Sequence, residues 1–172
     1  GTGQATIVTG LNVPQLIGRH YGPKPDAMTR TLLDQQNVFK TVVERGKTAA
    51  LIEAYPKQWH DQVNSGKRLP ASYQYAAKAA GLRFMDESDV VAGRGITGDW
   101  MRDVWRRDLN MPELELLTAY EAGQMLVDAS RAYDFAFMAH WMTDIVGHRG
   151  SVEKGIELIE RFDGVMSGVL DA

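Results

Sequence analysis

Residues 48–55, Thr-Ala-Ala-Leu-Ile-Glu-Ala-Tyr, and residues 134–142, Asp-Phe-Ala-Phe-Met-Ala-His-Trp-Met, are the two most strand-like stretches of this sequence. The first is short, largely apolar and followed by Pro56, a pattern typical of a strand buried on both faces of a parallel sheet. The second is equally hydrophobic. We therefore predict two buried strands at these positions.

Helical patterns surround the two stretches. Residues 27–45 predict one amphipathic helix, with Gly46 at the position where helices often end. Thr118 and Glu121 have the spacing of a capping box, which predicts the start of a further helix. The other predicted helices are 2–9, 57–80 with a break at Ser65-Gly66, and 151–170, the last with Val152, Ile156, Ile159, Phe162, Met166 and Val169 on one apolar face.

Alternating helices and strands predict an α/β protein with a mostly parallel sheet covered by helices. Two strands alone make a poor core, because both edges of such a sheet stay unpaired. The chain also starts at Gly1 without an initiator Met. We therefore expect residues 1–172 to be one α/β fragment of a larger domain, truncated at both ends, with any leader segment lost. Its bare sheet edges would allow a homodimer.

The amino-acid composition excludes several classes of protein for this chain. The 172 residues are 44% hydrophobic and 24% charged, as in globular proteins, and no apolar run is long enough to cross a membrane. With 19 basic and 22 acidic residues the net charge is −3, which gives no signature of nucleic-acid binding. The absence of cysteine excludes disulfides, thiolate metal sites and cysteine nucleophiles, and fits a cytoplasmic location.

Residues 143–150, Thr-Asp-Ile-Val-Gly-His-Arg-Gly, follow the second predicted strand, where ligands of open α/β sheets bind. Asp144 and His148 are four residues apart, so a carboxylate oxygen and an imidazole nitrogen can point at one divalent cation. Such a mixed pair suits Zn²⁺ or Mn²⁺ better than Ca²⁺. Arg149 is a candidate contact for an anionic substrate. The same spacing also fits an Asp at a helix start and a surface His.

Thr2 opens the first predicted helix. A threonine at this position commonly serves as a cap, but the same geometry favours an alkoxide and a bound phosphate. A bound metal would activate the hydroxyl as a nucleophile. His20, in the loop sequence Arg19-His-Tyr-Gly-Pro, is a candidate substrate contact or simply an exposed side chain.

Thr-Gly-Gln from residue 2, Ile-Gly-Arg-His-Tyr-Gly-Pro from residue 17 and Thr-Asp-Ile-Val-Gly-His-Arg-Gly from residue 143 together resemble the alkaline phosphatase superfamily. The similarity is to its metalloenzyme branch, which contains cofactor-independent phosphoglycerate mutase and phosphopentomutase. In that branch a Ser or Thr accepts the phosphoryl group and contacts metal. Thr2 matches this residue, with Gln4 in place of a His, and Asp144 and His148 match two ligands of one ion.

The resemblance implies a partial three-layer sandwich and a complete site with two divalent ions, Mn or Zn, that clamp the transferred phosphoryl group. The substrate would be a phosphorylated small molecule contacted by Arg19, His20 and Arg149. Residues 56–117 would form a helical, loop-rich insertion. The family's Asp-Gly strand, Asp-His-Gly motif and further His ligand are absent here, so we expect the isolated chain to be inactive, with no metal bound. The alternative is a non-catalytic binding or interaction module derived from the same fold.

Overall fold

The computed structural model describes all residues from 1 to 172 and is mostly helical, with 56% of residues in helices and 6% in strands or isolated bridges. The chain forms two compact units from interleaved segments. Unit 1 contains Gly1–Leu51, Lys57–Phe84 and Tyr133–Ala136, and unit 2 contains Ile52–Pro56, Met85–Ala132 and Phe137–Ala172. No helix of either unit combines the length and the apolar character that crossing a membrane requires.

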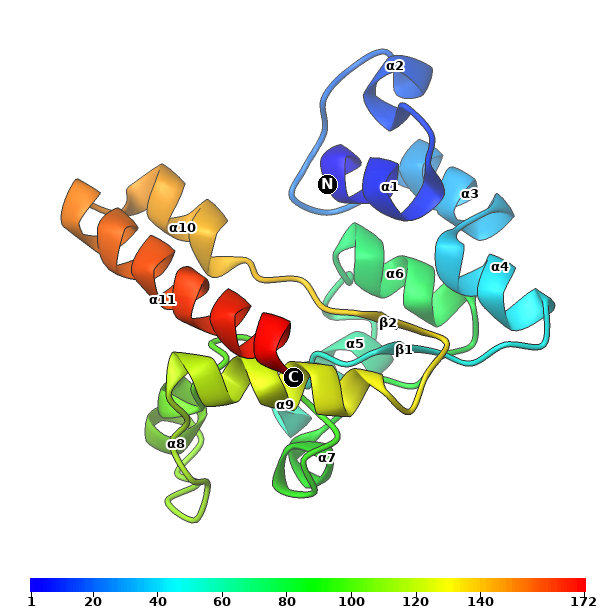
Figure 1. Cartoon of the computed structure of the whole chain (residues 1–172). Coiled ribbons are helices and arrows are strands. Elements are labelled where there is room, and N and C mark those ends of the chain that lie inside the picture. Colours follow the sequence, from blue (N-terminus) through cyan, green and yellow to red (C-terminus); the bar gives the residue numbers. More distant parts are fainter. The chain divides into compact units, whose positions relative to one another are not determined.

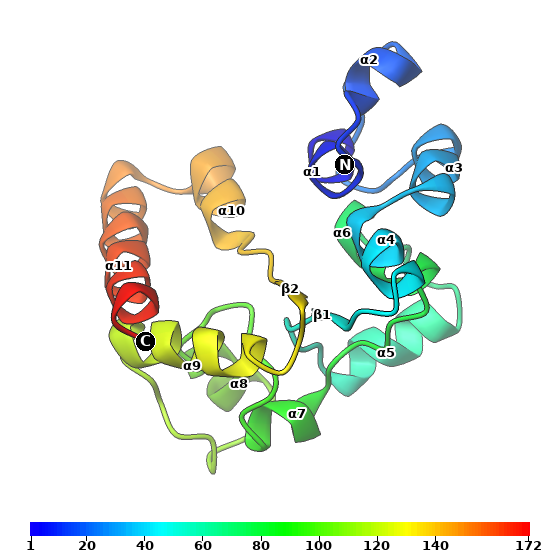
Figure 2. The ribbon, with the colours of Figure 1, turned by 45° about the vertical axis from the view of Figure 1, so that its right-hand side comes forward.

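Unit 1 is a group of short helices in which α1, α3 and α4 pack against α6 (Figure 2). Its core includes Leu33 and Phe39, both fully buried, and the Phe39 ring meets the Phe135 ring edge to face with centroids 5.5 Å apart. The helices are α1 (Thr2–Thr9), α2 (Val13–Ile17), α3 (Ala27–Gln35), α4 (Val38–Glu44), α5 (Lys57–Asn64) and α6 (Ser72–Ala79).

The single helix predicted over 27–45 is two helices, because Asn37 interrupts it. The Asn37 side chain is buried, and its amide donates to the Leu33 carbonyl oxygen at 2.8 Å. Its Oδ1 accepts from the Lys40 backbone N–H at 3.0 Å, which caps the start of α4. At the other end of α4, Gly46 has a φ of +71° and donates to the Val43 carbonyl oxygen at 2.9 Å, so the predicted glycine stop is confirmed.

Unit 2 is built around α9 and α11, which cross at close range (Figure 1). The capping box predicted at the start of α9 is confirmed: the Glu121 N–H donates to Thr118 Oγ1 at 3.2 Å, and the Thr118 N–H donates to Glu121 Oε2 at 2.8 Å. The helices of this unit are α7 (Glu87–Val91), α8 (Asp103–Asp108), α9 (Ala119–Ser130), α10 (Met142–Arg149) and α11 (Val152–Asp171).

Glycines set the α9–α11 crossing. A Cβ on Gly123 would meet the Val165 carbonyl oxygen, and a Cβ on Gly168 would meet the Tyr120 carbonyl group. The buried side of α11 is therefore the one carrying Leu158, Val165 and Gly168. The apolar face predicted from the sequence lies largely exposed instead, because the helix turns its glycines toward α9. Its exposed members are Val152, Ile156, Ile159, Phe162 and Met166.

The predicted three-layer α/β sandwich is wrong. The structure has one two-stranded parallel sheet, formed by β1 (Ala49–Leu51) and β2 (Phe135–Phe137). Residues 50–55 are buried as predicted, but Thr48 is exposed, and beyond β1 the stretch makes only isolated bridges, Glu53 with Ile96 and Ala54 with Met85. The stretch 134–142 leaves the strand after three residues. Short apolar runs do not distinguish a sheet strand from other buried chain, because a strand exists only where partners pair with it.

Candidate functional site

Thr2 and His20 form a hydrogen-bonded pair in unit 1. Thr2 lies in the first turn of α1 and is fully buried, and its Oγ1 is 3.0 Å from Nδ1 of the exposed His20. The Tyr21 backbone N–H donates to the same Oγ1 at 3.3 Å, while the Thr2 N–H donates to the Tyr21 carbonyl oxygen at 2.8 Å. When His20 Nδ1 carries no proton, the Thr2 hydroxyl donates to it. In that form the pair has the hydroxyl and imidazole groups of a nucleophile and its general base.

The sequence patterns do not indicate that Thr2 and His20 form a pair, because 18 positions separate them. His20 was predicted as a substrate contact, but it lies against the candidate nucleophile itself. The one local signal is the Gly- and Pro-rich composition of residues 18–26, which allows the chain to fold back over the start of α1.

An ion pair holds the loop that carries His20. Arg19 Nη2 lies 2.9 Å from Asp26 Oδ2, and the Arg19 guanidinium is also 5.1 Å from the centre of the Tyr21 ring. Asp26 Oδ1 accepts from the Thr29 N–H at 2.9 Å, so the same carboxylate caps α3. Arg19 therefore has a structural partner within the loop, and its contact with substrate stays a prediction.

Asp26 should contribute stability only above acidic pH. The Thr29 backbone N–H, followed by Arg19, lowers the pKa of Asp26 to about 2, below the roughly 3.9 of an unfolded chain. A carboxyl with a lowered folded-state pKa stabilises the fold above the unfolded value, and this contribution disappears as pH falls from about 4 through about 2.

We expect the difference in unfolding free energy between wild type and Asp26→Asn to be constant near pH 6 and to vanish near pH 2. Asn preserves the helix cap, so the comparison isolates the charge. Urea unfolding at several pH values measures the difference, and NMR titration of the Asp26 carboxyl carbon checks the pKa. A carboxyl titration midpoint near 4 would contradict the expectation.

Asp144 and His148 lie on one face of α10 in unit 2. His148 Nε2 is 3.6 Å from Asp144 Oδ1, and each side chain is 77% exposed. Arg149 is also exposed, at the end of the same helix. The sequence pattern places these residues directly after a predicted strand. Residues 142–149 are helical in the structure, so the i, i+4 spacing brings Asp144 and His148 together.

The Asp144–His148 pair fits two ligands of one divalent cation, because an oxygen and a nitrogen donor converge from one helix face. It does not make a complete site. No three His, Asp or Glu side chains of the structure are grouped so that they could hold an ion together, whereas catalytic zinc sites use three protein ligands.

Unit 2 also contains a cluster of buried polar groups that the sequence reasoning missed. The His140 ring stacks on Trp100 with centroids 3.5 Å apart, and neither ring nitrogen has a hydrogen-bond partner. Thr97 Oγ1, Asp99 Oδ1 and Trp100 Nε1 are likewise buried and unpartnered. Burial lowers the pKa of His140 and raises that of Asp99, because it disfavours the charged form of each. The signal available in the sequence was Gly98, which lies between Thr97 and Asp99.

Trp100 adopts a φ of +65°, which is unusual for a bulky residue. The Val104 N–H donates to Asp99 Oδ2 at 2.9 Å and ties the turn to α8. Buried unpartnered groups in a strained turn are typical of functional positions, and ordered water or a small polar ligand could satisfy them.

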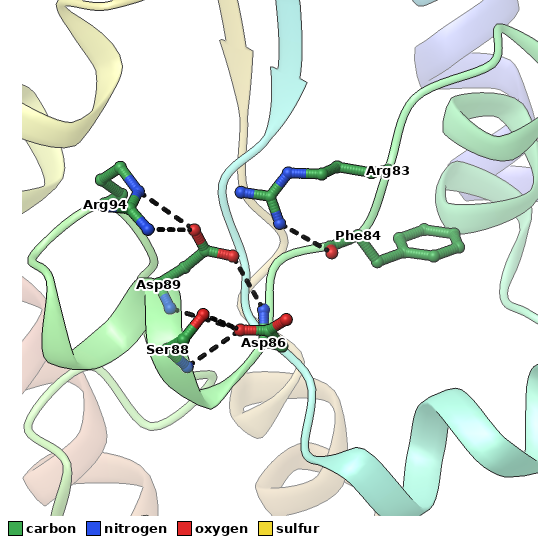
Figure 3. A network of polar contacts seen from close by, with 6 residues as sticks. All are labelled: Arg83, Phe84, Asp86, Ser88, Asp89 and Arg94. Atoms are coloured by element: carbon green, nitrogen blue, oxygen red, sulfur yellow. Dashed lines mark hydrogen bonds and ion pairs between the residues drawn. The ribbon is translucent and has the colours of Figure 1, made fainter.

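Figure 3 shows a network of hydrogen bonds and an ion pair within residues 86–94 of unit 2, the segment that precedes Thr97. Asp86 Oδ1 accepts from the Ser88 N–H at 2.9 Å and caps α7, while the Asp86 N–H donates to Asp89 Oδ2 at 3.1 Å. Arg94 pairs with the buried Asp89 through Nη2 at 3.0 Å. These contacts are structural: they hold the chain that enters the 97–102 turn.

The structure thus brings Thr2 to His20 in unit 1 and Asp144 to His148 in unit 2. No family model, curated protein or solved structure matches the chain.

Proposed function

We propose that the chain is part of a phosphoryl-transfer or phosphate-ester-hydrolysing enzyme that forms a phosphothreonine on Thr2. The observation that carries the proposal is the 3.0 Å contact between Thr2 Oγ1 and His20 Nδ1. The motif resemblance to the alkaline phosphatase superfamily supports phosphorus, rather than a carbonyl carbon, as the electrophile. The substrate is a phosphorylated small molecule, and the location is cytoplasmic, in keeping with a cysteine-free sequence.

In the first step Thr2 Oγ1 attacks the phosphorus atom of the ester, and its proton passes to His20 Nδ1. The bond between phosphorus and the leaving oxygen breaks, and the departing alcohol takes the proton back from His20. Water or a second alcohol then accepts the phosphoryl group from the phosphothreonine. Since Thr2 is fully buried, residues 18–26 must move to admit the substrate.

Asp144 and His148 in unit 2 would hold a divalent cation, Mn²⁺ or Zn²⁺. A divalent ion bound there would supply Lewis-acid chemistry. Because the pair offers only two ligands, we expect weak metal binding and little turnover from the 172 residues alone.

The test is turnover of 4-nitrophenyl phosphate with Mn²⁺ or Zn²⁺, in the 172-residue chain and in any longer product of its coding sequence. Thr2→Ala should lower kcat by roughly 10³-fold or more, whereas Thr2→Ser keeps a hydroxyl and should retain activity. His20→Gln should lower kcat by about 10²-fold to 10⁴-fold.

Thr9→Ala is the matched control. Thr9 lies at the other end of α1, and its hydroxyl donates to the Ala5 carbonyl oxygen at 2.7 Å, so this variant removes a threonine hydroxyl away from His20. Mass spectrometry of the trapped enzyme should place phosphate on Thr2. Unchanged turnover in Thr2→Ala, or phosphate on another residue, would overturn the proposal.

The exposed apolar face of α11 favours the alternative function, a non-catalytic interaction module. Val152, Ile159 and Leu170 are 75%, 68% and 80% exposed along this helix, and contiguous exposed apolar surface marks interaction sites. In that case Thr2→Ala and Asp144→Asn would leave binding of a partner unchanged, whereas Ile159→Glu would weaken it. Loss of activity or metal binding in the first two variants favours the enzyme.

A further inference from the structure

We propose that unit 1 carries a second site, a pocket that binds a small organic phosphate. The pocket has a volume of 450 Å³, within the range of ligand sites. It lies between α3, α5 and α6 and is closed along one edge by the loop that joins α5 to α6. All the residues that line it belong to unit 1.

One part of the pocket wall is apolar and another is cationic. Val63, Leu69 and Pro70 provide the apolar part. Arg68 and Lys78 provide two cations, and neither is ion-paired with an acidic side chain. A ligand with an anionic group on an apolar body would contact both parts at once.

The one carboxylate in the wall is already engaged. Asp34 Oδ2 accepts a hydrogen bond from the Tyr75 hydroxyl at 3.1 Å. Burial and the Asp34 charge raise the pKa of Tyr75, so the tyrosine keeps its proton and goes on donating to Asp34 at neutral pH. Arg68 and Lys78 together outweigh the single carboxylate of Asp34, so the wall has a net formal charge of +1.

Lys24 is a third cation that interacts electrostatically with Arg68. Lys24 is half-buried, and both its burial and the neighbouring charge of Arg68 lower its pKa. Like charges held together without an acidic partner destabilise one another, and a bound anion relieves that repulsion.

A phosphate monoester fits better than a monovalent anion. It carries a charge of about −1.5 to −2 near neutral pH, so it is attracted more strongly by Arg68 and Lys78 than a monovalent anion is. The Arg guanidinium fork also suits the geometry of phosphate oxygens. The apolar wall of Val63, Leu69 and Pro70 is then available for the organic group.

Phenyl phosphate is the probe, titrated into ¹⁵N-labelled protein and followed by NMR. The titration uses the Thr2→Ala background with EDTA, so neither the proposed nucleophile nor a metal contributes. We expect saturable shifts of the Gly66, Tyr75 and Lys78 amides. Inorganic phosphate, which lacks the ring, and phenol, which lacks the charge, should both bind more weakly.

Arg68→Gln should weaken phenyl phosphate binding about tenfold, because a charge-assisted hydrogen bond is lost. Lys67→Gln is the matched control: Lys67 adjoins Arg68 in the same loop and is exposed as Arg68 is, but it does not line the pocket. Thermal unfolding verifies that both variants fold. Equal affinities in the two variants, absence of saturable shifts at these amides, or equal binding of phenol would overturn the proposal. Inactivity of Thr2 variants would not affect it.

Discussion

Gly168→Ala is expected to lower the free energy of unfolding of unit 2 by about 3 kcal/mol. A Cβ at this position would meet the carbonyl group of Tyr120 and the backbone nitrogen of Gln124, on the facing helix. Backbone atoms cannot rotate away as a side chain can, so α9 and α11 must separate. Separation removes contacts along the whole crossing, including those of the buried Val165.

Gly155→Ala in the same helix is the matched control, and its effect should have the opposite sign. A Cβ on Gly155 meets nothing within 4 Å. Alanine then stabilises the helix by about 0.5–1 kcal/mol, because glycine loses more backbone entropy on folding. Urea unfolding followed by circular dichroism measures both variants. Similar effects of the two substitutions would show that the close crossing of α9 and α11 does not form in solution.

Phe39→Ala is expected to cost unit 1 about 3–5 kcal/mol of unfolding free energy. Phe39 is completely buried and contacts the edge of the Phe135 ring. Truncation removes apolar burial and leaves a cavity that the surrounding helices fill only in part. Phe39→Leu, which keeps most of the volume, should cost less than about 1.5 kcal/mol.

Val43→Ala controls for effects on α4 itself. Val43 lies one turn after Phe39 and is 39% exposed, so its truncation should change stability by no more than about 0.5 kcal/mol. Denaturant titrations of the three variants provide the comparison. If Val43→Ala cost as much as Phe39→Ala, the assignment of Phe39 to the core would be wrong.

Helix boundaries set by neighbouring residues were predictable. The Thr118–Glu121 box, the Gly46 stop and the break after Asn64 all depend on contacts within a few positions of the chain. The break at Asn37 was missed because it depends on a side chain whose competing hydrogen bonds the apolar periodicity does not reveal.

The fold class was not predictable from the two apolar stretches. Residues 50–55 are buried as expected, but burial does not require a large sheet. After β1 ends at Leu51, isolated bridges to Ile96 and Met85 take the place of strand pairing for part of this segment. The number of strands depends on which distant segments pair, and the apolar pattern does not indicate which segments those are.

The two contacts of the candidate site differ in how far the sequence indicates them. The side-chain chemistry and spacing in the sequence make candidates of Thr2, Asp144 and His148. The helix in residues 142–149 accounts for the Asp144–His148 contact. The contact of Thr2 with His20 needs the fold of the loop between them, which Arg19 and Asp26 hold.

Local sequence therefore accounts for helix starts, helix stops and the contacts between residues one turn apart, because few torsion angles separate the partners. Tertiary packing accounts for the rest: the small sheet, the face of α11 that is buried, and the contact between Thr2 and His20. Each of these depends on atoms far apart along the chain. The burial of Gly168 rather than the apolar face of α11 is the clearest case, since close backbone approach to Tyr120 outweighs the apolar pattern of the helix.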